Sequence, residues 1–177
     1  LLFLVAWPYM GATRFTLHVA SLTFIYAVVA SYWNLLNGYS GILSLGNLGF
    51  FAVGAYVSAV LSIELGLSPW ITVWIGGVVA MIIVTTLLGL PALRLRGIYI
   101  ALLTLVFELA LPSIISLLND WTGGGIGLLG IPTFIEGIER WQAYYLTLTF
   151  AVVALFVLYR IINGRTGMAF VALRDAE

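Results

Sequence analysis

The stretch at residues 37–56, NGYSGILSLGNLGFFAVGAY, decides how the rest of the chain is interpreted. It places glycine at 38, 41, 46, 49 and 54 in surroundings that are otherwise largely apolar. Each glycine costs a helix about 1 kcal/mol relative to alanine, so this many indicate a backbone that another group approaches closely. In a membrane, a neighbouring helix packs against such small residues, or the stretch is a broken or re-entrant helix beside a polar path.

The composition places the chain in a membrane. Hydrophobic residues make up 63% and charged residues 8%, and the mean hydropathy is +1.15. A soluble domain carries about 25% charged residues. The zero net charge excludes the basic surface that nucleic acid requires. With one histidine and no cysteine, the chain offers no metal cluster, no cofactor site and too few groups for catalysis, so we expect no enzyme.

Six hydrophobic segments follow one another, at 1–10, 15–36, 42–63, 70–90, 98–118 and 143–162. Each of the five later segments is long enough to cross a hydrocarbon core of about 30 Å. The first segment is short and is expected to be the end of a truncated helix. We therefore predict an all-α, polytopic membrane protein whose residues 1–177 form a single transmembrane domain, incomplete at both ends.

The distribution of arginine predicts the topology. If all six segments cross, one side of the membrane holds Arg94, Arg96, Arg160, Arg165 and Arg174, and the other holds Arg14 and Arg140. The positive-inside rule then assigns residues 91–97 and 163–177 to the cytoplasm and 119–142 to the outside. A re-entrant hairpin at 38–54 would fit the count nearly as well, so both arrangements stay open.

Polar and small side chains in the glycine-rich stretch suggest two uses. Gly54, Ser58 and Ser62 recur every four residues, which predicts a face for close helix packing. Upstream of this face, four residues give polar groups and a flexible backbone where a helix would start or break: Ser40, Gly41, Ser44 and Asn47. They are candidates for a translocation path, with packing alone as the alternative.

Glu108 is the ionisable residue nearest the middle of a predicted membrane segment. A carboxylate there costs about 2.5–3.5 kcal/mol on insertion scales, so it should face protein or water. Pro112 removes the amide hydrogen that the Glu108 carbonyl would accept, and Thr104 adds a hydroxyl one turn earlier. Glu108 and Thr104 either line the path or lock two helices together.

Two further segments lie outside the predicted membrane helices. In the 119–141 loop, the spacing of Phe134, Ile135, Ile138 and Trp141 predicts a short helix on the membrane interface. At the end of the chain, 163–177 is amphipathic, with Met168 and Ala172 on one face of a helix starting near Gly167. Such a helix lies on lipid or docks into the groove of a partner.

Three motifs, in this order, resemble the permease subunits of branched-chain amino acid ABC importers, of the LivM type. They are GYSGILSLGNLGFFAVGAY at 38–56, LRLRGIYIALLTLVFELAL at 93–111 with TGGGIGLLGIP at 122–132, and GRTGMAFVALRDAE at 164–177. Two positions depart from the family's pattern, because Asn47 stands where histidine is frequent and Met168 where arginine is frequent.

The resemblance implies a permease of the prokaryotic cytoplasmic membrane that imports branched-chain amino acids by alternating access. Its implied partners are cytoplasmic ATPase subunits, where ATP would be hydrolysed, a second and similar permease, and an external binding protein. The resemblance also implies that further helices follow the coupling segment. That cytoplasmic coupling segment, 163–177, would contact the ATPase through Arg165, Gly167, Ala172, Arg174, Asp175 and Glu177.

Two alternatives remain at this point. A secondary amino acid transporter driven by an ion gradient uses broken helices and a carboxylate within the membrane equally well. A related ABC importer could carry urea or amides instead of branched-chain amino acids. A membrane protein that does not transport is the least favoured reading, because the chain lacks catalytic groups.

Overall fold

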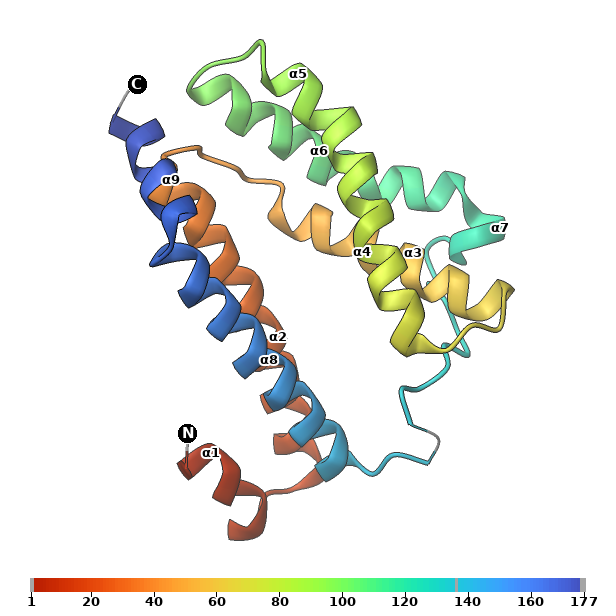
Figure 1. The fold of residues 1–177 in the computed structure, drawn as a ribbon. Coiled ribbons are helices and arrows are strands. Elements are labelled where there is room, and N and C mark those ends of the chain that lie inside the picture. Colours follow the sequence, from red (N-terminus) through yellow and green to blue (C-terminus); the bar gives the residue numbers. More distant parts are fainter. Residues whose placement is uncertain (1, 136, 176–177) are drawn as a thin grey trace. The chain divides into compact units, whose positions relative to one another are not determined.

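The computed structural model describes residues 2–135 and 137–175, and every regular element in that part of the chain is helical (Figure 1). The elements are α1 (Leu2–Ala6), the 3₁₀ helix η1 (Trp7–Met10), α2 (Arg14–Asn34), the π-helix η2 (Leu35–Tyr39), α3 (Asn47–Glu64), α4 (Pro69–Val84), the π-helix η3 (Thr85–Gly89), α5 (Leu90–Ala92), α6 (Ile98–Leu117), α7 (Asn119–Thr122), α8 (Arg140–Ile162) and α9 (Arg165–Asp175).

Five helical stretches among the described residues are long and apolar enough to cross a membrane. They are Arg14–Tyr39, Asn47–Glu64, Pro69–Ala92, Ile98–Leu117 and Arg140–Ile162. The predicted all-α class and the five predicted membrane segments are thereby confirmed. At the N-terminal end, α1 has five residues, which is too short to cross.

The chain divides into two compact units. The first combines the part up to Gly41 with the part from Gly137 onward, and so contains α1, α2, α8 and α9. The second begins at Ile42 and contains α3, α4, α6 and the loop that follows them.

In the first unit, α2 and α8 lie side by side and run in the same direction (Figure 1). Near their N-terminal ends, Tyr144 is fully buried in a cluster with Leu17 and Ala20. Farther along, the Tyr32 hydroxyl donates to the Ala154 carbonyl at 3.0 Å. The predicted topology places Arg14 and Arg140 on the same side of the membrane. These residues begin α2 and α8, so the parallel pairing agrees with that topology.

Two tyrosines of α8 bind the short N-terminal helix. The Tyr144 hydroxyl donates to the Leu4 carbonyl at 2.7 Å, and the Tyr145 hydroxyl donates to the Val5 carbonyl at 2.8 Å. The last carbonyls of a helix have no partner within it, so these bonds satisfy groups that α1 leaves open. They hold α1 against α8 although the sequence separates the two helices by more than a hundred residues.

In the second unit, α3 and α4 pack through small side chains. The missing Cβ of Gly76 would lie 2.9 Å from the Gly54 carbonyl oxygen and 2.9 Å from the Ser58 Cβ, so the two backbones touch here. Thr72 is 0% exposed, and its hydroxyl lies 2.6 Å from that of Ser62. The small-residue face predicted for Gly54, Ser58 and Ser62 is therefore confirmed as a packing face, and its partner is α4.

The helix α6 packs on the other end of α3. Gly49 lies against Leu111 and Phe107, and the centroids of the Phe50 and Phe107 rings are 5.9 Å apart. The helix continues through Pro112 without interruption. In this unit α3 is antiparallel to α4 and parallel to α6, as expected of three successive membrane crossings.

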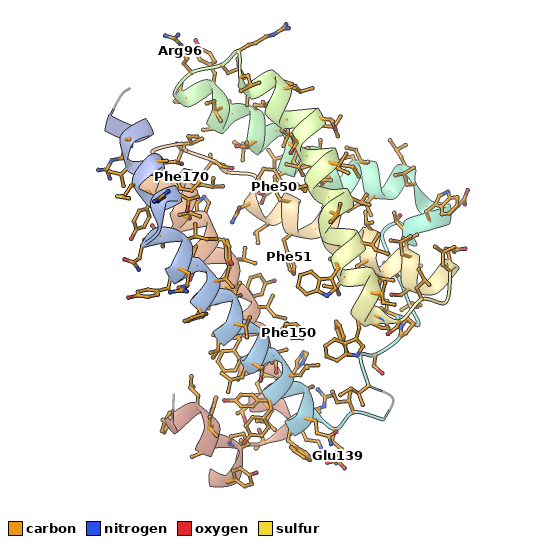
Figure 2. All side chains as sticks on the ribbon, viewed as in Figure 1. Phe50, Phe51, Arg96, Glu139, Phe150 and Phe170 are labelled. Atoms are coloured by element: carbon orange, nitrogen blue, oxygen red, sulfur yellow. The ribbon has the colours of Figure 1, made fainter. Side chains whose placement is uncertain are left out.

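Two predicted boundaries are wrong. The helix expected from residue 42 begins at Asn47, because residues 41–46 are not helical and Gly41 has a left-handed backbone with φ 73°. The short interface helix expected at 134–141 is absent from residues 134–135 and 137–139, where Gly137 has a left-handed φ of 68°. Instead, α8 begins at Arg140 behind a capping box made by Glu139 (Figure 2).

We expect Gly76→Val to destabilise the second unit and Gly77→Val to leave it nearly unchanged. A side chain at 76 would push α3 and α4 apart, which costs about 1–3 kcal/mol, whereas a Cβ at 77 meets nothing within 4 Å. The measurement is thermal unfolding of the two purified variants in the same detergent. Equal melting temperatures for both variants would contradict the close approach of α3 and α4.

Candidate functional site

The six residues predicted for a translocation path fall in both units. The first unit contains Ser40 and Gly41, and the second contains Ser44, Asn47, Thr104 and Glu108. The four residues of the second unit come from the non-helical segment, the start of α3 and the first half of α6. The structure brings Thr104 together with the non-helical segment, which sequence spacing alone does not show.

Thr104 anchors the non-helical segment 41–46. Its hydroxyl accepts a hydrogen bond from the Leu45 amide at 2.9 Å and lies 3.0 Å from the Ala101 carbonyl, to which it donates. The side chain is 5% exposed. The segment approaches this closely because Gly46 has no side chain, and a Cβ there would lie 2.6 Å from the Thr104 carbonyl oxygen. Thr104 thus supplies a partner for an amide that no helix satisfies.

The two polar residues on either side of Leu45 have different surroundings. Ser44 is buried, whereas Asn47 is half-buried and is the first residue of α3. Their polar groups therefore lie at the N-terminal end of a membrane-length helix, where the first amides have no partner within the helix. A polar solute group could be accommodated at such a helix end.

In the first unit, Ser40 and Gly41 follow the π-helix η2. Ser40 is buried, and its amide donates to the Leu35 carbonyl at 3.3 Å while its hydroxyl donates to the Leu36 carbonyl. Single π-helical turns are frequent at functional sites. Here the turn ends at Tyr39, and the left-handed Gly41 lies two residues beyond it.

Glu108 is half-buried on α6, one turn beyond Thr104. Between them, Phe107 faces Gly49 of α3, so the α6 surface next to Glu108 is in helix contact. Half-burial is compatible with both roles considered for the carboxyl group, in a path or between helices. Its function remains a prediction.

The helix α9 follows α8 after the short turn at residues 163–164. The Thr166 hydroxyl donates to the Ile161 carbonyl at 3.1 Å, and Gly167 is buried against the Ile162 carbonyl oxygen, which leaves no room for a side chain. The helix begins at Arg165, two residues before the expected start near Gly167. Met168 is 68% exposed.

The residues predicted for ATPase coupling differ in exposure. Arg165, Ala172 and Arg174 are exposed, and Gly167 is buried. Asp175 is the last residue of α9, and Glu177 lies outside the described residues. Arg174 also reaches inward, since its guanidinium Nη1 lies 3.4 Å from the Gly38 carbonyl oxygen, to which it donates.

Sequence reasoning did not find two of these contacts. The pairs Leu45–Thr104 and Gly38–Arg174 are separated by 59 and 136 residues. Gly41 and Gly46 indicated that another group could approach the backbone closely, because they lack a side chain. Neither glycine shows which residue approaches. No group of acidic, histidine or cysteine side chains in the described part of the chain is arranged to hold a metal ion.

Residues 15–177 match a family model described as "Branched-chain amino acid transport system / permease component". The chain is similar to the high-affinity branched-chain amino acid transport system permease protein LivM of Escherichia coli K12, with 34% identity over 98% of this chain and 47% of the relative. The protein of the same name from Salmonella typhimurium LT2 is 33% identical over the same shares.

The chain spans about half the length of these curated relatives. No solved structure was found to match it. The family match covers all five membrane-length helices except the first residue of one of them, together with α9. The chain therefore belongs to the family of permease components of branched-chain amino acid transport systems.

Proposed function

We propose that this chain is part of a permease subunit of an ABC importer that carries branched-chain, hydrophobic amino acids across the prokaryotic cytoplasmic membrane. The observation that supports this most strongly is the family match over residues 15–177, which includes both the broken glycine-rich stretch and α9. The names of the two relatives support the substrate class. Related importers for urea or amides are the alternative substrate assignment.

The proposed mechanism is alternating access. ATP-driven closure of two cytoplasmic ATPase subunits would move α9, and the helices around residues 40–47 and 104–108 would open the path to one side at a time. A second, similar permease would complete the path, and an external binding protein would deliver the amino acid. ATP hydrolysis would occur in the partner subunits, so the chain itself would not be an enzyme.

The arginine distribution supports the proposed orientation. The parallel helices α2 and α8 begin at Arg14 and Arg140, whereas Arg160 lies in the last turn of α8 and α9 follows it. The exposed Arg94 and Arg96 lie in the turn before α6 (Figure 2). With α9 and this turn in the cytoplasm, the positive-inside rule is satisfied.

Purification of the complete assembly tests the proposed function. The full-length protein, purified gently from its native membrane, should carry an ATPase subunit and a similar permease in stoichiometric amounts. In proteoliposomes with the binding protein, ATP should drive uptake of radiolabelled leucine, isoleucine or valine. Uptake that follows an imposed ion gradient without ATP would instead identify a secondary transporter.

Glu108→Gln should lower the transport rate about tenfold or more if the carboxylate meets the substrate's ammonium group, since hydrogen bonds to charged groups contribute about 1.5–3 kcal/mol. The matched control is Glu64→Gln, which makes the same change at the exposed last residue of α3. Uptake assays on both variants provide the measurement. Wild-type transport and substrate preference in Glu108→Gln would assign the carboxyl a structural role.

Met168→Asp should weaken ATPase docking at least about fivefold, because a charge would enter an apolar contact, while Met168→Leu should behave like the wild type. The readouts are the amount of ATPase retained during purification and the ATP hydrolysis coupled to uptake. Membrane insertion should be the same in both variants, because the side chain is 68% exposed. Full ATPase retention in Met168→Asp would exclude this face of α9 from docking.

A further inference from the structure

The helix α9 contacts the backbone of its own unit where the π-helix η2 ends. Figure 1 shows α9 beside the end of α2, from which η2 continues. The Arg174 guanidinium donates to the Gly38 carbonyl across 3.4 Å. Gly38 belongs to the last turn of η2, where carbonyl groups lack partners within the helix. Arg174 therefore binds a group that the end of η2 leaves available.

A second observation at the same place concerns Gly41. Its φ is 73°, and a Cβ built on it would lie 2.9 Å from the Arg174 Cγ and 3.5 Å from the Arg174 Cβ. The absence of a side chain at 41 thus lets the aliphatic stem of Arg174 pack on the backbone. Arg174 touches the chain on both sides of Ser40, with its guanidinium at Gly38 and its stem at Gly41.

Gly41 also occupies a particular place along the chain. It ends the N-terminal part of the first unit, and the non-helical residues 42–46 follow it in the second. Four residues farther on, the Leu45 amide is bound to Thr104. Gly41 is thus held by α9 within the first unit, and Leu45 is held by α6 within the second. Because the stretch between them has no helical hydrogen bonds of its own, its backbone can adjust more easily than a helix.

We propose that Arg174 is a positioning residue that ties α9 to Gly38 and Gly41, so that a displacement of α9 is passed to the non-helical segment. The inference rests on the proposed function, in which α9 is the element that the ATPase moves. It assigns Arg174 a role within the permease, distinct from the ATPase contact that the family resemblance implies. The exposed Met168 remains on α9 for docking.

Substitution of Arg174 gives the first part of the test. In the full-length complex, Arg174→Ala should lower transport about tenfold while ATP hydrolysis and ATPase retention stay near the wild-type values. Arg174→Lys should restore most of the transport, because lysine retains an aliphatic stem and a donor for the Gly38 carbonyl. Loss of ATPase retention in Arg174→Ala would overturn the proposal in favour of a direct ATPase contact.

An engineered disulfide between residues 41 and 174 gives the second part of the test. The built Cβ of residue 41 lies 3.5 Å from the Arg174 Cβ, within the range of about 3.5–4.5 Å that disulfides require. The double variant Gly41→Cys/Arg174→Cys should therefore form a bond on mild oxidation, detected by mass spectrometry. When reduced, it should transport as poorly as Arg174→Ala. When oxidised, it should recover transport, because the bond replaces the tie that Arg174 provides.

Two controls isolate the effect. Gly66→Cys/Arg174→Cys places a cysteine at another left-handed glycine, with φ 60° and nothing within 4 Å of its Cβ, and should show no recovery on oxidation. Gly41→Cys alone measures the cost of a side chain at the left-handed position. Both should be compared with the double variant in the same oxidising and reducing buffers.

The outcomes separate the inference from the proposed function. A disulfide that forms and restores transport supports the positioning role. A disulfide that does not form, or that forms without recovery while the wild-type complex transports, overturns it. If the wild-type complex shows no ATP-driven uptake, the proposed function fails, and with it the positioning role that rests on it, even where the disulfide confirms the contact.

Discussion

Backbone amides that lie in a low-dielectric layer must find hydrogen-bond partners, and residues 41–46 are where this constraint is hardest to meet. The helices satisfy their own backbones, whereas this segment depends on side chains from other elements. Thr104 supplies an acceptor for the Leu45 amide, and Gly46 lets the segment come close enough for that bond. The start of α3 at Asn47 follows from this anchoring, and the α3 faces that meet α4 and α6 follow from where α3 starts.

Much of the fold could be predicted from local sequence features. Long apolar runs set the five membrane-length helices, and the four-residue spacing of Gly54, Ser58 and Ser62 identified a packing face. Helix ends were harder to predict. A glycine such as Gly41 or Gly137 ends a helix only when tertiary contacts hold it in the left-handed conformation. The contacts of Thr104 and Arg174 could not be predicted, since apolar periodicity shows which face is buried and not which distant residue meets it.

The two proposed functional regions share a physical design. In each, a side chain from a regular helix reaches the backbone of an irregular segment that a glycine leaves accessible: Thr104 at Gly46, and Arg174 at Gly41. A glycine at such a point gives up side-chain packing and permits direct contact with the main chain. The glycine-rich stretch would thus provide backbone groups that other helices contact, in addition to any contact with a transported amino acid.

The pairing of α1 and α2 with α8 has a consequence for the order of events during biosynthesis. The Leu4 carbonyl and its donor Tyr144 are separated by 140 residues. At roughly 5–20 residues per second, the ribosome needs about 7–28 s to produce the second after the first. During that interval α3 and α4 can already pack on each other, whereas α2 still lacks α8, its long helical partner within the first unit. The nascent α2 therefore has to keep its α8-facing side against another surface, such as lipid or the translocon, until α8 is inserted.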